Sequence, residues 1–358
     1  MQKKYKIIGV MSGTSLDGID LAYIIFWQEN STWQFSIQQA ETLAYPVHWV
    51  EKLKNLVNFS AEQLNNIDED YTQYLANTVK HFIEKYDLHD VNAICSHGHT
   101  ALHQPQKGLT YQIGNLPKLA NLLGKTVVCD FRVQDVALGG QGAPLVPIGD
   151  KLLFAQYGYC LNLGGFANIS TELNNERIAY DICPVNIVLN KYVGTLGLAY
   201  DNEGQLASEG NTNEPLLKQL SALPFYSKKH PKSLGLEWVD ETIFPLIDAF
   251  KLNIKDVLRT FVEHIAEMLA LEINKKENAT VLVTGGGAYN AFLMQRLKHF
   301  ANNKIIIPNK AIVEFKEALI FGFLGVLKLE NKVNCLKSVT GAARDHSSGK
   351  IYYPTKIT

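Results

Sequence analysis

A glycine-rich segment near the N-terminus has the residue types that bind a phosphate group. It follows an apolar run and reads MSGTSLDGID from residue 11 to residue 20. Glycine lets the backbone approach a phosphate, and successive N–H groups form an anion-binding nest. Ser12, Thr14 and Ser15 add hydroxyl donors, and Asp17 and Asp20 could orient a cation or be ordinary turn acids. The commonest hairpin loops have only about two residues, so a turn of this length favours a function.

Two further glycine turns occur in the second half of the chain. Asn162–Asn168 has a glycine pair between two expected strands, and Thr284–Asn290 has a glycine triplet between an expected strand and a helix. A triplet in that context permits close approach of a planar ring or a phosphate at the helix N-terminus. It does not fit the dinucleotide fingerprint, because Asn290 takes the place of the third glycine. The two turns therefore indicate nucleotide binding without that fingerprint.

Asp181 stands at the end of an expected strand, just before Pro184, at which a helix is expected to begin. A carboxylate near a helix N-terminus stays ionised at neutral pH, which suits a general base. A helix cap would explain the same acid equally well. The residues alone leave both interpretations open.

Polar side chains also follow two strands of the first half. His97, His99 and His103 lie after one of them. They lack a clear fourth metal ligand, which favours the polar lining of a sugar-binding cleft over a metal site. Arg132 is a natural partner for a substrate carboxylate, although an ion pair with Asp135 would also explain it.

The hydrophobic pattern predicts that both halves read strand, glycine-rich turn, strand, strand, helices, strand. The expected strands are 5–11, 19–27, 33–43, 91–96, 126–129, 157–163, 166–171, 177–180, 280–283 and 304–307. The expected helices are 48–86 with breaks near 60 and 68, 254–273, one from 289, and 314–329. We expect one domain over residues 1–138, with 340–358 packing back on it, and a second over 139–339.

Composition narrows the function classes. The chain has 358 residues, with 34 Lys plus Arg against 35 Asp plus Glu, and this balance argues against a nucleic-acid partner. The longest apolar run, 318–327, is far below the roughly 20 residues of a membrane span, so no membrane partner is expected. That run could be core or an interface, which leaves a homodimer open. Five scattered cysteines predict buried free thiols and a cytoplasmic protein.

Together these segments resemble the anhydro-N-acetylmuramic acid kinase family of the sugar kinase/Hsp70/actin superfamily. The resemblance runs along nearly the whole chain through Gly9–Asp20, Ser96–Thr100, Arg132–Pro147, Asn162–Ser170, Asp181–Asn186, Pro231–Gly235 and Thr284–Asn290. It implies an α/β fold with two ribonuclease H-like (actin-like ATPase) domains flanking a central cleft. It also implies an ATP- and Mg²⁺-dependent kinase that opens 1,6-anhydro-N-acetylmuramic acid with water. Phosphorylation of O6 would then give N-acetylmuramic acid 6-phosphate in peptidoglycan recycling.

The resemblance assigns a role to individual residues. The ATP phosphate loop would be Gly13, Thr14, Ser15, Leu16, Asp17, Gly18, Ile19 and Asp20. The residues Asn162, Gly164 and Gly165 would face it, and the nucleoside would meet Gly285, Gly286, Gly287 and Asn290. The catalytic base would be Asp181, and the sugar side would be lined by His97, Arg132, Asp135 and Glu317.

The chain departs from the family pattern at several of these motifs, namely at His99, Ile182, Cys183, Val185 and Leu236. The family usually has glutamine where this chain has His99, and arginine where it has Leu236. It usually has glycine in place of Cys183 and of Val185. Two alternatives remain at this stage. One is another sugar kinase of the superfamily, and the other is a non-catalytic actin-like ATP switch.

Overall fold

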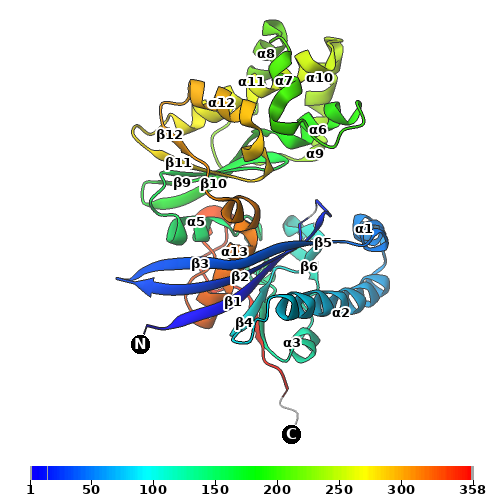
Figure 1. The fold of residues 1–358 in the computed structure, drawn as a ribbon, viewed down its shortest axis with the longest axis vertical. Coiled ribbons are helices and arrows are strands. Elements are labelled where there is room, and N and C mark those ends of the chain that lie inside the picture. The colour runs from blue at the N-terminus through cyan, green and yellow to red at the C-terminus, as the bar shows by residue number, and fades with distance from the viewer. Residues whose placement is uncertain (1, 14, 356–358) are drawn as a thin grey trace. The chain divides into compact units, whose positions relative to one another are not determined.

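The computed structural model describes residues 2–13 and 15–355, which form two compact units (Figure 1). The first contains the chain up to Leu153 and again from Phe315 onward, and the second is Phe154–Glu314. The expected borders, 138/139 and 339/340, differ from this division. The reason is packing, because the helix after Phe315 lies so close to the first sheet that an added Cβ on Gly9 would collide with Ala318. The segment before Leu153 packs on the same helix, since an added Cβ on Gly149 would collide with Ile320.

The first unit contains a six-stranded sheet in the order β13-β7-β4-β1-β2-β3. The strands β1, β2 and β3 form an antiparallel meander, and β4 and β7 run parallel to β1. The last strand, β13, pairs antiparallel with β7 at the opposite edge. These strands span Lys4–Met11 (β1), Gly18–Glu29 (β2), Thr32–Ala44 (β3), Ala93–Ser96 (β4), Thr126–Cys129 (β7) and Lys350–Tyr352 (β13).

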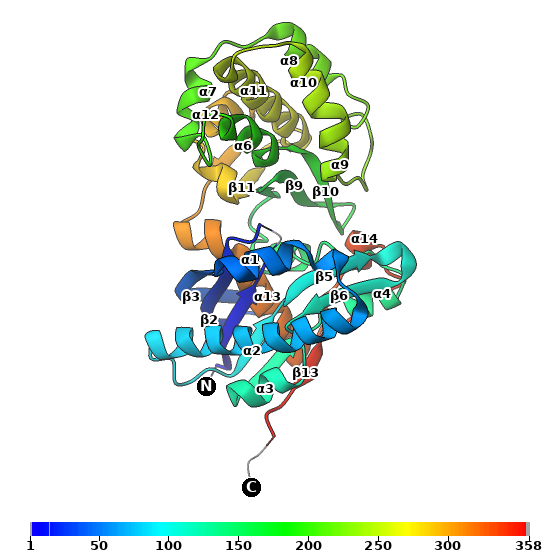
Figure 2. The same cartoon turned by 90° about the vertical axis from the view of Figure 1, so that its right-hand side faces the viewer.

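Helices cover both faces of this sheet (Figure 2). Ile8 and Val10 point to a core shared with α2, whose N-terminus carries a capping box between Ser60 and Gln63. Gly9 points to the opposite face, where an added Cβ would collide with the backbone of Ala318 on α13. The apolar run 318–327 is buried there and belongs to the core. The helices are α1 (Val47–Lys54), α2 (Ala61–Lys85), α3 (Lys118–Leu123), α4 (Val133–Ala137), α5 (Pro147–Leu153), α13 (Lys310–Leu329) and α14 (Lys337–Thr340).

The second unit contains a five-stranded sheet in the order β10-β9-β8-β11-β12. Here β8, β9 and β10 form the antiparallel meander, and β11 and β12 run parallel to β8. The strands span Tyr159–Leu163 (β8), Phe166–Leu173 (β9), Glu176–Pro184 (β10), Thr280–Thr284 (β11) and Lys304–Ile306 (β12).

The main helix of the second unit is α11, which begins at Ile254 and ends at Ile273 as the periodicity predicts. Its apolar side forms a core with Tyr159, Leu161 and Ile169 of the sheet. The other helices are α6 (Asn186–Gly194), α7 (Gln205–Glu209), α8 (Glu214–Ser221), α9 (Leu236–Trp238), α10 (Phe244–Ala249) and α12 (Ala291–Phe300).

Both sheets thus contain an antiparallel meander of three strands. The first strand of each meander pairs on its other side with a parallel strand, which is followed by a second parallel strand. This arrangement is the ribonuclease H-like α/β fold, and the expected fold class of the two units is confirmed. Sequence reasoning missed β13 and the hairpin of β5 (His99–Gln104) and β6 (Leu109–Ile113). It also placed a helix start at Pro184, which ends β10 instead, because the helix begins two residues later.

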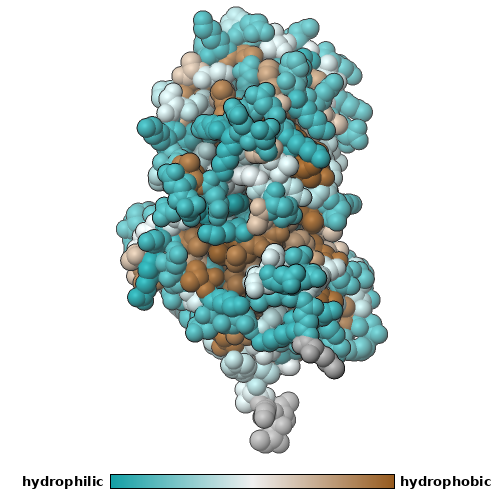
Figure 3. Space-filling view, turned by 90° about the vertical axis from the view of Figure 1, so that its left-hand side faces the viewer, coloured by the Kyte–Doolittle hydropathy of each residue, from teal (hydrophilic) through white to brown (hydrophobic). Residues whose placement is uncertain are grey.

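The surface agrees with the balanced composition. Hydrophilic side chains cover much of the face drawn in Figure 3, and hydrophobic ones emerge between them. Within the described residues, no helix has the length and apolar character to cross a membrane.

Candidate active site

The first glycine turn connects β1 to β2 and leaves open space beside its backbone. An added Cβ on Gly13 would find its nearest neighbour, the Ser15 Oγ, 3.6 Å away. Ser15 donates a 2.6 Å hydrogen bond to Asp17, and Leu16 has a φ of 60°, in the left-handed region. Thr14 lies outside the described residues. A turn with unfilled space at a glycine can admit the oxygens of a phosphate.

The remaining residues assigned to the phosphate loop lie in β2. An added Cβ on Gly18 would stand 2.6 Å from the carbonyl oxygen of Leu43, so this glycine permits the contact with β3. Ile19 is fully buried in the core. Asp20 accepts a 2.6 Å hydrogen bond from Thr42 across the strand pair. The structure therefore limits the part of this segment that is open to a phosphate to the turn itself.

A buried network of hydroxyl groups contacts Ser12 at the start of that turn. Ser12 lies 2.6 Å from the hydroxyl of Tyr45 and 2.7 Å from Nδ1 of His99. Tyr45 in turn lies 2.6 Å from the hydroxyl of Tyr71 on α2. Burial lowers the pKa of His99 to about 4, so its ring is neutral at pH 7. Sequence reasoning missed both tyrosines, because only the fold brings them to Ser12.

His97 and Arg132 form a pair in the first unit. Nε of Arg132 donates a 2.9 Å hydrogen bond to Nε2 of His97. The other ring nitrogen of His97 lies 2.9 Å from the carbonyl oxygen of Gly98, so it carries the proton. Burial and the neighbouring guanidinium hold the pKa of His97 well below its usual range. Neutral His97 therefore orients Arg132, whose pKa burial lowers to about 10 and which stays charged at neutral pH.

Asp135 takes a different place from the one expected at the sugar side. Its side chain is fully buried and accepts hydrogen bonds from the Gly142 N–H at 2.7 Å, the Thr340 hydroxyl at 2.7 Å and the Cys335 thiol at 3.0 Å. An added Cβ on Gly140 would collide with the same carboxylate. Because these donors surround it, Asp135 positions the glycine-rich segment that ends at Gly142, and Gly142 in turn accepts a hydrogen bond from Arg132.

Glu317 on α13 is solvent-exposed, unlike Asp135. Protein crowds it nonetheless, and desolvation raises the pKa of its carboxyl, an effect that the positive charges of Arg132 and Lys316 partly offset. Because the side chain is exposed, a solute can reach the carboxylate. Glu317 is thus a charged group near Arg132 that a polar ligand can reach.

The two glycine turns of the second unit lie against each other. Gly285 has a φ of 83°, and an added Cβ would stand 2.7 Å from Oδ1 of Asn162 and 2.8 Å from the carbonyl oxygen of Leu163. An added Cβ on Gly287 would stand 2.7 Å from the Cβ of Leu163. These glycines therefore allow the turn after β11 to pack on the end of β8. The structure brings the predicted residues Asn162 and Gly285 together.

The start of α6 joins the same cluster. The N–H of Asn186 donates to the carbonyl oxygen of Gly164 at 3.3 Å, and that of Val185 donates to Gly165 at 2.8 Å. Gly286 has its nearest neighbour, the side-chain amide of Asn186, 3.8 Å away. Asn290 caps α12, because its Oδ1 accepts the Leu293 N–H at 2.9 Å, and its contact with a nucleoside stays a prediction.

Asp181 lies in β10 at a β-bulge, where the register with β9 shifts before Cys183. The N-cap of α6 is Val185, which has no side-chain cap, so the interpretation of Asp181 as that cap is wrong. One carboxylate oxygen accepts a 2.8 Å hydrogen bond from the N–H of Leu234. Burial raises the pKa of Asp181, and this hydrogen bond partly opposes the rise. A half-buried carboxylate with a raised pKa is a stronger base than an exposed one.

A loop after α8, residues 226–235, holds Asp181 in place. The N–H of Asp181 donates to the carbonyl oxygen of Lys232 at 3.1 Å, and Leu234 two residues later binds the carboxylate. The side chain of Lys232 is almost fully buried, and its ammonium group lies 3.8 Å from Glu272. The sequence motif around Lys232 was visible as part of the resemblance, but its contact with Asp181 depends on the fold.

Comparison with known proteins decides the family. The family profile described as anhydro-N-acetylmuramic acid kinase matches residues 5–354. The chain belongs to the anhydro-N-acetylmuramic acid kinase family. Proteins with that name from Shewanella denitrificans and Mannheimia succiniciproducens are 33% and 34% identical to it, each over 98% of the chain and over 99% and 100% of their own lengths.

The solved structures that match this chain are less similar to it in sequence. The (R)-2-hydroxyglutaryl-CoA dehydratase component A of Acidaminococcus fermentans is 11% identical, with a TM-score of 0.45, over 88% of this chain and 95% of its own. A glucokinase of the ROK family from Streptomyces griseus, in complex with glucose and AMPPNP, is 12% identical with a TM-score of 0.40, over 89% and 98%.

A member of the anhydro-N-acetylmuramic acid kinase family that uses Mg-ATP needs oxygen ligands for Mg²⁺ beside the phosphates. Magnesium prefers oxygen ligands and is usually held by one or two carboxylates together with substrate phosphates. Exposed Asp17 in the first turn has the right chemistry for that role. Among the described residues, the cluster of three candidate ligands is Asp135, Cys335 and His346, which is buried and contains a thiol. A thiol does not suit magnesium, so this cluster does not fit the ion.

Proposed function

We propose that this chain is an ATP-dependent kinase that adds water and a phosphoryl group to 1,6-anhydro-N-acetylmuramic acid. The product would be N-acetylmuramic acid 6-phosphate, an intermediate of peptidoglycan recycling. The observation that carries the proposal is Asp181, whose half-buried carboxylate is fixed by one backbone N–H and has a raised pKa. Membership of the family supports the choice of substrate.

The anhydro bridge explains why one base can serve the whole reaction. O6 carries no proton in the bridged sugar, so there is no hydroxyl for a base to deprotonate. Asp181 would take a proton from water, and the water oxygen would form a bond to the anomeric carbon. The bond from that carbon to O6 then breaks, and O6 attacks the γ-phosphoryl group as ADP leaves.

The remaining groups have roles that follow from their chemistry. The open turn at Gly13 would bind ATP phosphates through backbone N–H groups, and Mg²⁺ beside Asp17 would neutralise part of their charge. The cluster of Asn162, Gly165 and Gly285 would receive the rest of the nucleotide. Arg132, oriented by His97, would pair with the carboxylate of the sugar's lactyl group.

The test is an ADP-release assay with the anhydro sugar and Mg-ATP. We expect release that depends on the sugar, and a product heavier than the substrate by one water and one phosphoryl group. In heavy-oxygen water, the label should appear at the anomeric hydroxyl and not in the phosphate. Phosphorylation of ordinary N-acetylhexosamines instead would indicate another sugar kinase, and ATP binding without sugar-dependent release would indicate a switch. The cytoplasmic location stays a prediction.

A further inference from the structure

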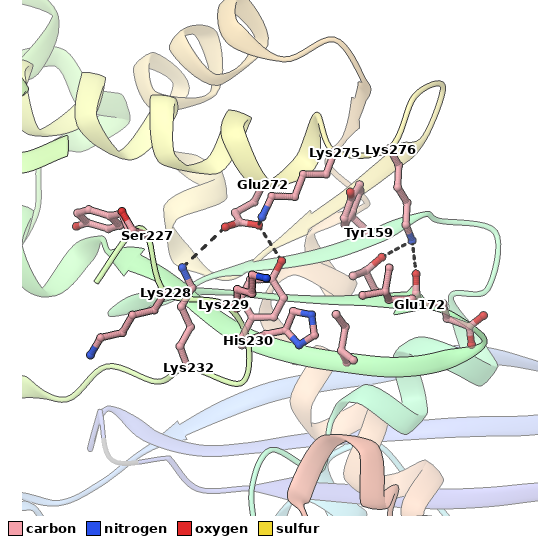
Figure 4. Close-up of a pocket in the computed structure, with 15 residues that line it drawn as sticks. Tyr159, Glu172, Ser227, Lys228, Lys229, His230, Lys232, Glu272, Lys275 and Lys276 are labelled. Atoms are coloured by element: carbon pink, nitrogen blue, oxygen red, sulfur yellow. Dashed lines mark hydrogen bonds and ion pairs between the residues drawn. The ribbon is translucent and has the colours of Figure 1, made fainter. Parts of the chain in front are cut away.

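A cavity of about 360 Å³ lies on one face of the second unit's sheet, and we call it the lysine pocket (Figure 4). Its floor is a row of cross-strand neighbours, since Thr171 of β9 pairs with Tyr159 of β8 and with Ile178 of β10. The end of α11 and the loop 226–232 form its walls. A volume of this size is typical of pockets for small molecules.

The lining is strongly cationic. Two glutamates, Glu172 and Glu272, face a larger set of lysines. Glu272 accepts from the hydroxyl of Tyr180 at 2.8 Å and pairs with two of the lysines. The lysines are Lys228, Lys229, Lys232, Lys275 and Lys276. Positive charge thus remains in excess around a pocket that is open to solvent on one side, which favours an anionic occupant.

Aromatic rings line the same cavity. The ring of His230 stacks on that of Tyr180, with centroids 5.5 Å apart and planes at 21°. The ammonium group of Lys276 lies 5.1 Å from the centroid of Tyr159 and donates to the Thr171 hydroxyl at 2.6 Å. Lysine ammonium groups bind phosphate, and aromatic faces cover the apolar face of a ring. Together these groups match a small phosphorylated ring compound such as a sugar phosphate.

The pocket and Asp181 share one structural element. Side chains alternate between the faces of a strand, so Asp181 points away from the face on which Tyr180 contributes to the pocket. The loop that forms the pocket wall, from Tyr226 to Lys232, continues directly to Leu234. Lys232 and Leu234 make the two backbone contacts to Asp181. A ligand that moves this loop therefore changes the position and basicity of the carboxylate.

We propose that the lysine pocket is an effector site for a phosphorylated sugar, and that its occupancy alters turnover through the loop that holds Asp181. The coupling to turnover rests on the proposed function of Asp181, whereas the binding itself does not. The reaction's own product belongs to the same chemical class, so the site would provide feedback.

Binding is tested with N-acetylglucosamine 6-phosphate as probe, by calorimetry on the full chain. Titration with N-acetylglucosamine measures the contribution of the sugar ring to the affinity, and titration with inorganic phosphate measures that of the charge. We expect saturable binding of the sugar phosphate that weakens about tenfold or more in Lys276→Gln and in Lys275→Gln, since each variant loses a charged donor. Lys218→Gln, which changes an exposed lysine on α8 outside the pocket, should bind as the unmodified chain does. Absence of binding, or equal binding by all variants, overturns the site.

Coupling is tested by ADP release with and without the probe. We expect the probe to change kcat and its pH profile in the unmodified chain and in Lys218→Gln, and to have less effect in Lys275→Gln and Lys276→Gln. Competition at the active site would instead raise KM equally in all four proteins, and that result overturns the coupling. Binding at the pocket with unchanged turnover overturns it too. Failure of the proposed function is distinguishable, because it would abolish turnover without any probe.

Discussion

Five strands of the first unit's six-stranded sheet have the same order as the five strands of the second, yet glycine is needed at Gly13 and at Gly285 for different reasons. In the first unit, an added Cβ on Gly13 has no neighbour closer than 3.6 Å. In the second, an added Cβ on Gly285 would stand 2.7 Å from Asn162. The first turn is open to a ligand at Gly13, whereas Gly285 and Gly287 allow the turn after β11 to pack on the end of β8. The other glycines of the second unit's turns, Gly164, Gly165 and Gly286, are as open as Gly13, because an added Cβ would have no neighbour closer than 3.5 Å. Glycine content alone therefore does not distinguish a binding loop from a packing site.

The acids of the two units differ in the same way. Asp135 in the first unit is fully buried and accepts hydrogen bonds from three donors. Asp181 in the second is half-buried and accepts one from Leu234. Asp135 lies in α4 and Asp181 lies in β10, and both matched the family pattern. Asp135 is buried and surrounded by three donors, so it stabilises the structure. Asp181 is more exposed and accepts one hydrogen bond, so it can take a proton.

The largest expected effect comes from Asp181→Asn. The amide keeps the shape and can still accept from Leu234, but it cannot take a proton from water. We expect sugar-dependent ADP release to fall by about 10²–10⁴-fold, with ATP affinity largely unchanged. Asp240→Asn, an exposed change in the same unit, is the matched control and should be fully active. Activity of Asp181→Asn within about tenfold of the unmodified chain would remove Asp181 as the base.

Gly285→Val should destabilise the second unit. The residue has a left-handed φ of 83°, and its Cβ would collide with Asn162 and Leu163. We expect the free energy of unfolding to fall by about 3 kcal/mol, from backbone strain and overpacking together. Chemical denaturation measures it. An unchanged midpoint would mean that this turn is as open as the one at Gly13.

Asp135→Ala distinguishes positioning from substrate contact. The variant leaves buried donors on Gly142, Thr340 and Cys335 without their acceptor, so we expect a loss of about 2–3 kcal/mol of stability. Thermal unfolding with and without the sugar is the measurement. If the stability is kept and only KM for the sugar rises, Asp135 contacts substrate directly, as the sequence suggested.

Gly13→Val tests the open turn. Its Cβ has room in the free protein, so we expect little change in stability. The side chain would occupy the space proposed for phosphate oxygens, and ATP affinity should fall by about tenfold or more, which is about 1.4 kcal/mol. Nucleotide titration by calorimetry measures this. Unchanged ATP affinity would contradict the phosphate-loop assignment.

The smallest effect concerns the pH dependence of stability. Folding raises the pKa of Asp181, so the folded chain binds this proton more tightly than the unfolded chain. Stability from this group is therefore fully present below the unfolded pKa, near 3.9, and is lost as pH rises through the folded pKa. Asp181→Asn should be more stable than the unmodified chain at pH 7, by roughly 1.4 kcal/mol per unit of pKa shift.

The difference in the free energy of unfolding between Asp181→Asn and the unmodified chain is measured by chemical denaturation at several pH values. We expect the advantage of Asp181→Asn to shrink as pH falls and to disappear below about pH 4. The acid limb of kcat/KM should likewise lie above the pKa of an ordinary aspartate. A stability difference that is constant across this range would mean that the carboxyl does not change its pKa on folding.

The sequence by itself determined the elements with a strong local signal. The helix Ile254–Ile273 and the strand Thr126–Cys129 agree with the predicted bounds, because apolar periodicity and flanking turn residues act within a few positions. The duplicated strand pattern indicated two α/β domains, and the ordered motifs indicated the family and with it the ribonuclease H-like fold. The strand Lys350–Tyr352 has only three residues and pairs with a strand more than 200 residues away, so it has no comparable signal.

Only the tertiary structure decided which polar residues are available for chemistry. The network beneath Ser12 depends on Tyr45 and Tyr71, which lie 33 and 59 residues away along the chain. The donors to Asp135 from Cys335 and Thr340 lie 200 and 205 residues away. Burial and hydrogen-bond partners are properties of the folded neighbourhood, and a residue's type and local spacing do not contain them. For that reason the motifs identified the residues of the candidate site, while the fold showed which of them are accessible for reaction and which hold the structure in place.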